Sequence, residues 1–193
     1  ASPSIVNFNS NPTMLTCNNS TVTLLGSSST VGASYLWTGA STIIDPTTSS
    51  PQVVSPGTFT LAVTGPNGCV RSKTVQVLSD KSSPSTPVIT KPLTLTCTRT
   101  SIDLQVDPVD ATMSYVWSSS NLGITSDPKL AKITVNKAGT YTVTAQSKSN
   151  GCVSYKDVTV FTDYREPSPS IAATSYLIDC SNPTVVLDAS ASI

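Results

Sequence analysis

The chain contains no histidine, and charged residues make up only 11% of its 193 residues, with a formal net charge of +0. Histidine is the side chain that most often serves as a general base or metal ligand near neutral pH. A chain with no positive excess also lacks the basic surface that binds nucleic acid or an anionic membrane. The composition therefore argues against nucleic-acid binding, and against catalysis by a hydroxyl group that histidine activates.

Long apolar runs and helical periodicity are missing as well. No apolar run reaches the roughly 18 residues of a membrane-spanning helix, so no membrane insertion is expected. No segment repeats apolar residues at the three- and four-residue spacing of an amphipathic helix. Serine and threonine supply most of the polar positions, which suits the solvated faces of β-sheets. These features predict an all-β protein.

A repeated strand pattern organises the rest of the chain. Residues 57–69 read Gly-Thr-Phe-Thr-Leu-Ala-Val-Thr-Gly-Pro-Asn-Gly-Cys, and residues 139–152 follow the same pattern. Apolar and small polar side chains alternate there, as in a half-buried strand. An Asn-Gly turn signal and a second β-rich run, at residues 70–78 and 153–161, follow in each copy. Each copy therefore predicts a β-hairpin, which needs further strands to cover its apolar face.

Shorter phrases recur around the two hairpins. Three cysteines end equivalent phrases at nearly equal intervals: Leu15-Thr16-Cys17, Leu95-Thr96-Cys97 and Ile178-Asp179-Cys180. The sequence thus predicts one module at residues 1–83, a second at 84–166, and the start of a truncated third at 167–193. Residues 79–86 and 162–168 are short and rich in Pro, Ser and charge, which is typical of semi-rigid linkers.

Each module is expected to be a β-sandwich. Roughly seven short strands with frequent turn signals are typical of this fold. The expected core residues are two Tyr-x-Trp pairs and two Gly-Thr-aromatic corners: Tyr35, Trp37, Tyr115, Trp117, Gly57, Phe59, Gly139 and Tyr141. Both tryptophans occupy the place of the buried tryptophan of an immunoglobulin-type domain. Tyr141 can make the hydroxyl bond of a tyrosine corner, whereas Phe59 cannot.

The combination of Pro-x-Ile, x-Thr-Cys, Tyr-x-Trp, Gly-Thr-Tyr-Thr-Val and Asn-Gly-Cys resembles the tandem immunoglobulin-like or PKD-like repeats of secreted Bacteroidetes proteins. These include the large gliding-motility adhesins that the type IX secretion system exports. The resemblance covers the whole chain. It implies an all-β fold of tandem immunoglobulin-like β-sandwiches and an extracellular location at the bacterial cell surface.

The function that this resemblance implies is structural or adhesive. The chain is expected to be part of the stalk of a long cell-surface adhesin, with gliding motility as one setting. Its expected partners are neighbouring repeats of the same chain and a surface polysaccharide or other cell-surface ligand. Two alternatives stay open, namely spacer modules of a secreted hydrolase and the shaft of an extracellular filament.

No catalytic, metal-binding or cofactor-binding constellation stands out, so the chain is not expected to be an enzyme or to hold a cofactor. A serine–lysine arrangement with Lys129, Lys132 or Lys156 is formally open, but such lysines are more often solvated surface residues. Asp45-Pro46 and Asp127-Pro128 recur at the same point of each module. Asp-Pro commonly opens a turn, whereas calcium needs several convergent oxygens, so turns are expected there.

Four aromatic residues fall outside the repeated phrases: Tyr155, Phe161, Tyr164 and Tyr176. Exposed aromatic side chains can stack on sugars, and buried ones pack between modules. Packing at the joints between modules is the expected use. Asp80 and Asp163 match across the two linkers, and no cluster of acids surrounds them in the sequence to hold a cation.

The five cysteines, Cys17, Cys69, Cys97, Cys152 and Cys180, are disulfide candidates and indicate an oxidising compartment. One pairing joins Cys17 to Cys69 and Cys97 to Cys152 within modules. In an immunoglobulin-type sandwich, however, Cys17 and Cys69 lie at opposite ends of strands that run roughly 33 Å over ten residues. A disulfide needs Cα atoms about 4.4–6.8 Å apart. Head-to-tail stacking instead pairs Cys17 with Cys152 and leaves the other three for further modules, and both pairings stay open.

Overall fold

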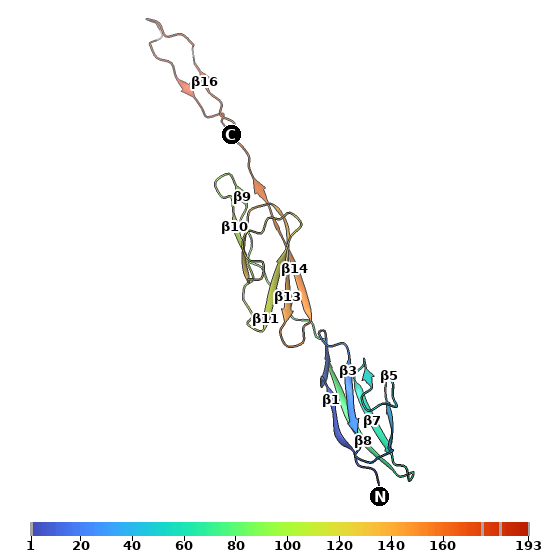
Figure 1. The fold of residues 1–193 in the computed structure, drawn as a ribbon. Helices are drawn as coiled ribbons and strands as arrows, with labels where there is room; N and C mark the ends of the chain where they lie inside the picture. The colour runs from blue at the N-terminus through green and yellow to red at the C-terminus, as the bar shows by residue number, and fades with distance from the viewer. Residues whose placement is uncertain (1, 175, 182, 193) are drawn as a thin grey trace.

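The computed structural model describes residues 2–174, 176–181 and 183–192, and none of these residues lies in a helix. Two β-rich units follow one another in line, with a thinner hairpin beyond them (Figure 1). The predicted all-β fold is therefore confirmed. In this part of the chain no helix is present that is long and apolar enough to span a membrane.

The first sandwich, β1–β8, consists of two sheets. One has the strand order β1-β3-β6-β5, with β1 at Val6–Asn11, β3 at Val22–Ser27, β6 at Gln52–Val53 and β5 at Ile43–Ile44. The other has the order β2-β8-β7-β4, with β2 at Met14–Thr16, β8 at Val70–Asp80, β7 at Gly57–Thr64 and β4 at Ser34–Gly39. The hairpin predicted from the first sequence pattern corresponds to β7 and β8.

Alternating side chains of both sheets fill the space between them. Leu24 of β3 and Leu61 of β7 are fully buried, because a period of two puts every second residue on the same face. The buried cluster comprises Leu15, Val22, Leu24, Trp37, Val53, Phe59, Leu61, Val63 and Val77. This cluster holds the first sandwich together, since burial of apolar surface is the main stabilising contribution to folding.

The second sandwich, β9–β15, repeats this plan. Its strands are β9 at Leu95–Thr96, β10 at Ile102–Gln105, β11 at Met113–Ser118, β12 at Lys132–Val135, β13 at Gly139–Ser147, β14 at Val153–Val160 and β15 at Thr162–Asp163. One sheet has the order β11-β13-β14, and β10 pairs with β12 in another. Side chains of both form one cluster: Leu95, Ile102, Leu104, Val106, Tyr115, Trp117, Ile133, Val135, Tyr141, Val143, Ala145 and Val160.

A short parallel pairing recurs at the same end of each sandwich. β2 pairs with the end of β8, so that Thr16 lies opposite Asp80. β9 pairs in the same way with β15, so that Thr96 lies opposite Asp163. Both aspartates were expected in linkers, and they lie in strands instead. This pairing fixes each cysteine-bearing turn against the point where the chain leaves the sandwich.

The remaining strands, β16 at Ala172–Ala173 and β17 at Leu187–Asp188, form the thin hairpin of Figure 1. Its apolar side chains are exposed, with Ile171 at 69% and Ile178 at 66%. The outer limits predicted for the first and third modules, residues 1 and 193, lie outside the described residues.

Candidate functional site

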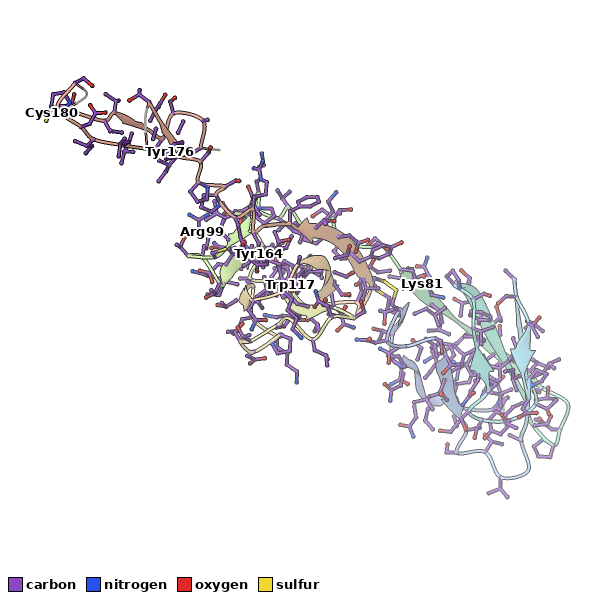
Figure 2. The ribbon with its side chains drawn as sticks, turned by 90° about the horizontal axis from the view of Figure 1, so that it is seen from above. Lys81, Arg99, Trp117, Tyr164, Tyr176 and Cys180 are labelled. Atoms are coloured by element: carbon purple, nitrogen blue, oxygen red, sulfur yellow. A yellow bond between two sulfur atoms is a disulfide. The ribbon has the colours of Figure 1, made fainter. Side chains whose placement is uncertain are left out.

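A disulfide joins Cys17 to Cys152, with their Cα atoms 5.0 Å apart and a separation of 135 positions in the sequence. Cys17 follows β2 of the first sandwich, and Cys152 precedes β14 of the second. The bond lies at the junction of the two sandwiches, next to Lys81 in Figure 2. This is the head-to-tail pairing, and neither of the within-module pairs is formed. Cys69, Cys97 and Cys180 are exposed free thiols.

Asn150 holds the same joint through hydrogen bonds to the first sandwich. Its side-chain Nδ2 donates to Asp80 Oδ1 at 3.1 Å and to the carbonyl oxygen of Ser82 at 2.9 Å. Its own carbonyl oxygen accepts from the backbone N–H groups of Cys17 and Asn18, at 3.0 and 3.3 Å. Asn150 is only 4% exposed, and losing a partner of a buried polar group costs roughly 1–3 kcal/mol. These bonds therefore fix the orientation of the turn on the first sandwich.

Gly151 allows the two backbones to approach closely. Its φ is 74°, a conformation that glycine adopts at little cost. A Cβ atom here would lie 2.0, 2.1 and 2.3 Å from three atoms of the Asn18 side chain. We call residues 147–152 the Cys152 turn and residues 16–19 the Cys17 turn. At position 151, both the backbone conformation and the contact with the Cys17 turn require glycine.

Asp80 supplies the charge at this joint. Hydrogen bonds from the Ser82 hydroxyl and then from the Asn150 amide hold the pKa of its carboxyl below the ordinary value. The carboxylate is thus ionised near neutral pH, and hydrogen bonds to an ionised acceptor are stronger than those between neutral groups. A further bond spans the linker, where Ser154 Oγ donates to the carbonyl oxygen of Ser85 at 3.0 Å. The joint is therefore held by a covalent bond, a hydrogen bond to a carboxylate and hydrogen bonds between neutral groups.

Trp37 and Trp117 lie where the sequence predicted the core, and each is 2% exposed. Their indole N–H groups donate to the carbonyl oxygens of Thr48 and Leu130, both at 3.1 Å. Tyr115 is 7% exposed, whereas Tyr35 is partly buried against the first core. The two tryptophans therefore have matching partners in the two sandwiches.

The Asp-Pro phrases belong to the same arrangement. The carbonyl oxygens of Pro46 and Pro128 accept from the backbone N–H groups of Trp37 and Trp117, at 2.7 and 2.8 Å. The Asp45 carbonyl oxygen also accepts from Thr48 N at 3.1 Å, as in a turn. The recurrence of Asp-Pro therefore follows from the packing around the tryptophans. No group of three or more His, Cys, Asp or Glu among the described residues is placed to hold a metal ion.

The two Gly-Thr-aromatic corners differ in the hydrogen bonds of the tyrosine hydroxyl, which also accepts from Asn121 Nδ2 at 3.3 Å. The Tyr141 hydroxyl donates to the carbonyl oxygen of Lys137 at 2.7 Å, which is the bond of a tyrosine corner. Phe59 is fully buried at the equivalent place without such a bond. Gly57 and Gly139 have φ values of 153° and 139°, so both corners use a backbone conformation that suits glycine.

The aromatic residues expected to pack at the joints do not do so. Tyr155, Phe161, Tyr164 and Tyr176 are 69%, 67%, 52% and 96% exposed. Tyr164 and Tyr176 lie towards the C-terminal end of the molecule in Figure 2, away from the disulfide. The expectation was wrong because the disulfide and the hydrogen bonds of Asn150 form the joint, and these four rings remain exposed.

Of the lysines considered for a serine–lysine arrangement, Lys132 is bound to a carboxylate. Lys132 forms an ion pair with Asp103 at 2.8 Å, and their side chains are 57% and 48% exposed. Exposed pairs of this kind contribute little to stability and are ordinary surface features. The sequence did not predict that Asn150 and Ser82 take part in the joint, because their contacts depend on how the two sandwiches meet.

No family model matches the chain, and no curated protein matches it. Several solved structures are similar to it at low identity. Murine CEACAM1b is 14% identical over 83% of this chain and 100% of that one, with a TM-score of 0.36. The N-terminal Ig1-2 module of the Drosophila receptor protein tyrosine phosphatase DLAR is 11% identical over 84% and 100%, with a TM-score of 0.32.

A fragment of intimin is also among these similar structures. The C-terminal 282-residue fragment of intimin, in complex with the intimin-binding domain of the translocated intimin receptor, is 10% identical. The match covers 86% of this chain and 66% of that chain, with a TM-score of 0.38. At these TM-scores none of the similarities carries an argument about activity, ligand or partner.

Proposed function

We propose that this chain is part of an extracellular stalk of tandem immunoglobulin-like modules that belongs to a cell-surface adhesin. The observation that carries the proposal is the joint, where a disulfide and the buried Asn150 tie consecutive sandwiches together. Domains that only need to be kept apart are usually joined by linkers that allow relative motion. A locked joint keeps the direction of the array and transmits tension from one module to the next.

The proposed modules are residues 1–83, 84–166 and 167–193. Two separate buried clusters support the first two, because one extends from Leu15 to Val77 and the other from Leu95 to Val160. The phrase around Ile178 supports the third. Its equivalents Leu15 and Leu95 are fully buried, so the exposed apolar face of the last hairpin suits the opening strands of a further sandwich.

The finer part of the proposal concerns location and ligand. A disulfide favours an oxidising compartment, which supports an extracellular protein. The recurring phrases support a gliding-motility adhesin of Bacteroidetes that the type IX system exports. The exposed rings of Tyr155, Phe161 and Tyr164 support a polysaccharide ligand, because aromatic faces stack on sugar rings.

A distance measurement between the sandwiches tests the stalk. Spin labels at two exposed positions, Ser72 and Lys129, report the separation of the two sandwiches in the oxidised chain and in the Cys17→Ser/Cys152→Ser variant. A stalk gives a narrow distance distribution that broadens several-fold in the variant. Equally broad distributions in both proteins would contradict a locked stalk and would favour a flexible spacer of a secreted hydrolase.

A further inference from the structure

We propose that the Cys69 turn and the Cys97 turn are the two unfilled halves of the joint described above. A second copy of this chain docks its Cys69 turn onto the Cys97 turn of the first copy, and the two thiols form a disulfide. The Cys69 turn comprises residues 65–69, and the Cys97 turn comprises residues 96–99. The inference deepens the proposed stalk function and rests on it, because the observed joint between Cys17 and Cys152 is its template.

The Cys69 turn shares its Asn-Gly-Cys segment with the docked Cys152 turn and is one residue shorter before it. Gly68 has a φ of 77° where Gly151 has 74°. The Cys69 N–H donates to Asn67 Oδ1 at 3.2 Å, and the Cys152 N–H donates to Asn150 Oδ1 at 3.0 Å. Each turn is closed by a 2.9 Å bond to the carbonyl oxygen of its cysteine. The first sandwich therefore presents, at its outer end, the same Asn-Gly-Cys conformation that the second sandwich uses to dock.

The Cys97 turn likewise has the geometry of the Cys17 turn. Thr16 N donates to the carbonyl oxygen of Asn19 at 2.9 Å, and Thr96 N donates to that of Arg99 at 3.0 Å. The return bonds, from the N–H groups of Asn19 and Arg99 to the threonine Oγ1 atoms, are both 3.0 Å. Asp163 lies opposite Thr96 as Asp80 lies opposite Thr16. The Asp163 carboxylate, which would accept a hydrogen bond from an incoming asparagine, thus lies at the position equivalent to Asp80.

Of the two Asn-Gly-Cys turns, the Cys152 turn is covered by another sandwich, and the Cys69 turn is not. A Cβ on Gly151 would overlap the Asn18 side chain, whereas a Cβ on Gly68 has nothing within 4 Å. Cys69 and Cys97 are both exposed. The side chain at the position of Asn18 in the Cys97 turn is Thr98, which is shorter and therefore fits the open space over Gly68. Shape thus allows the two turns to meet as the observed pair does.

The linker after the open half also differs from the one after the occupied half. Arg165 stands where the first linker has Ser82, and it binds Asp163 through an ion pair of 2.8 Å. Its Nε also donates to Asp163 Oδ1 at 2.8 Å, the atom that corresponds to the one that Asn150 uses on Asp80. An incoming Asn67 amide therefore competes with Arg165 for this carboxylate. The hairpin of β16 and β17 leaves the same end, so the docked copy takes the place that a sandwich completed on this hairpin would have in the stalk.

The bond forms by thiol–disulfide exchange with a small disulfide such as oxidised glutathione. The Cys97 thiolate attacks one sulfur of oxidised glutathione, so that a mixed disulfide forms and one glutathione thiolate leaves. The Cys69 thiolate of the second copy then attacks the Cys97 sulfur and releases the second glutathione. The two protein thiols lose two electrons and two protons, and oxidised glutathione is reduced to two thiols.

The test uses the full chain in a Cys180→Ala background, in which Cys69 and Cys97 are the remaining free thiols. With oxidised glutathione we expect a ladder of disulfide-linked oligomers on non-reducing gels, with Cys69–Cys97 as the main link in peptide maps. Adding Cys69→Ala leaves no oligomer larger than a dimer. Arg165→Ser, which restores the serine of the first linker, speeds linking several-fold, whereas the matched Lys129→Ser control does not.

Two results overturn the inference. One is equal yields of Cys69–Cys69, Cys97–Cys97 and Cys69–Cys97 links, as random collision of exposed thiols gives. The other is a linking rate that Arg165→Ser leaves unchanged. None of these variants alters Cys17, Asn150 or Cys152, so the distance distribution between the sandwiches still tests the stalk independently.

Discussion

Asn150 and Asp80 are coupled by one hydrogen bond across 70 residues of sequence. Asn150→Ala removes the second of the two groups that lower the Asp80 pKa, while Ser82, the larger cause, remains. We therefore expect the Asp80 pKa to rise part of the way to its ordinary value, as an NMR titration of the carboxyl carbon measures. The matched variant Asn67→Ala, in the equivalent turn of the first sandwich, leaves this pKa unchanged.

The sign of the pH dependence follows from the direction of the Asp80 shift. A carboxyl whose pKa is lower in the docked state stabilises that state at a pH above its ordinary pKa. The contribution is lost as the pH falls through the lowered pKa, so acid loosens the Asn150 contact before it affects the disulfide. An Asp80 pKa that Asn150→Ala does not raise would mean that the amide does not bind the carboxylate in solution.

The two tryptophans allow each core to be tested separately. Trp117→Ala is expected to destabilise the second sandwich by roughly 3–5 kcal/mol, the usual cost of truncating a large buried aromatic side chain. Trp37 is then the single remaining tryptophan, and its fluorescence reports the melting of the first sandwich. The melting temperature of the first sandwich should equal that in the wild-type chain. Trp37→Ala should instead destabilise the first sandwich and leave the melting temperature of the second unchanged. Loss of both sandwiches in one transition would contradict two independent cores.

At the scale of elements, Gly151 and Gly68 form a matched pair. Both have positive φ, so alanine at either position carries a backbone penalty of about 1–2 kcal/mol. Only at Gly151 does the added Cβ also overlap Asn18, so Gly151→Ala should push the Cys152 turn off the first sandwich.

The rate at which dithiothreitol reduces the Cys17–Cys152 disulfide measures that opening. We expect faster reduction in Gly151→Ala, because the loosened joint exposes the sulfur atoms, and a wild-type rate in Gly68→Ala. Equal acceleration in both variants would attribute the effect to backbone strain alone and not to the contact with Asn18.

The sequence predicts the hairpins well because their signals are local. The strand pair β7–β8 and the pair β13–β14 lie where alternation and an Asn-Gly signal predict them. The parallel pairs β2–β8 and β9–β15 have no such signal, because strands of two or three residues show no periodicity and their partners are distant in the sequence. The sequence shows that Asp80 and Asp163 recur at equivalent positions. It does not show that they lie opposite Thr16 and Thr96, because that placement depends on the parallel pairing.

The joint itself could be predicted only in part. Topology favours the pairing of Cys17 with Cys152, because Cys17 and Cys69 are expected at opposite ends of one sandwich, but the sequence leaves the within-module pairing open and the structure decides between them. The hydrogen bonds of Asn150 could not be predicted, because they depend on the angle at which two separately folded sandwiches meet. Tyr155 and Phe161 were misassigned to the joint for the same reason.

At the scale of the whole molecule, the disulfide determines which part of the chain bears a force that pulls on the two termini. The N-terminus lies at one end of the array and the last hairpin at the other, with the joint between the sandwiches (Figure 1). The bond links residues 17 and 152, so strands β3–β13 lie inside a closed loop. Tension applied at the ends therefore passes through the disulfide and does not extend the loop.

A force–extension measurement on single chains tests this path. The closed loop spans 135 residues, so at roughly 3.5 Å per extended residue its opening adds about 470 Å of length. We expect the oxidised chain to lack this extension at every force below bond rupture, and the same chain in a reducing buffer to show it. The Cys17→Ser/Cys152→Ser variant should show the full extension in both buffers. If the oxidised and reduced chains lengthened equally, the disulfide would not carry the tension, and the joint would be merely a contact between two independently stretched modules.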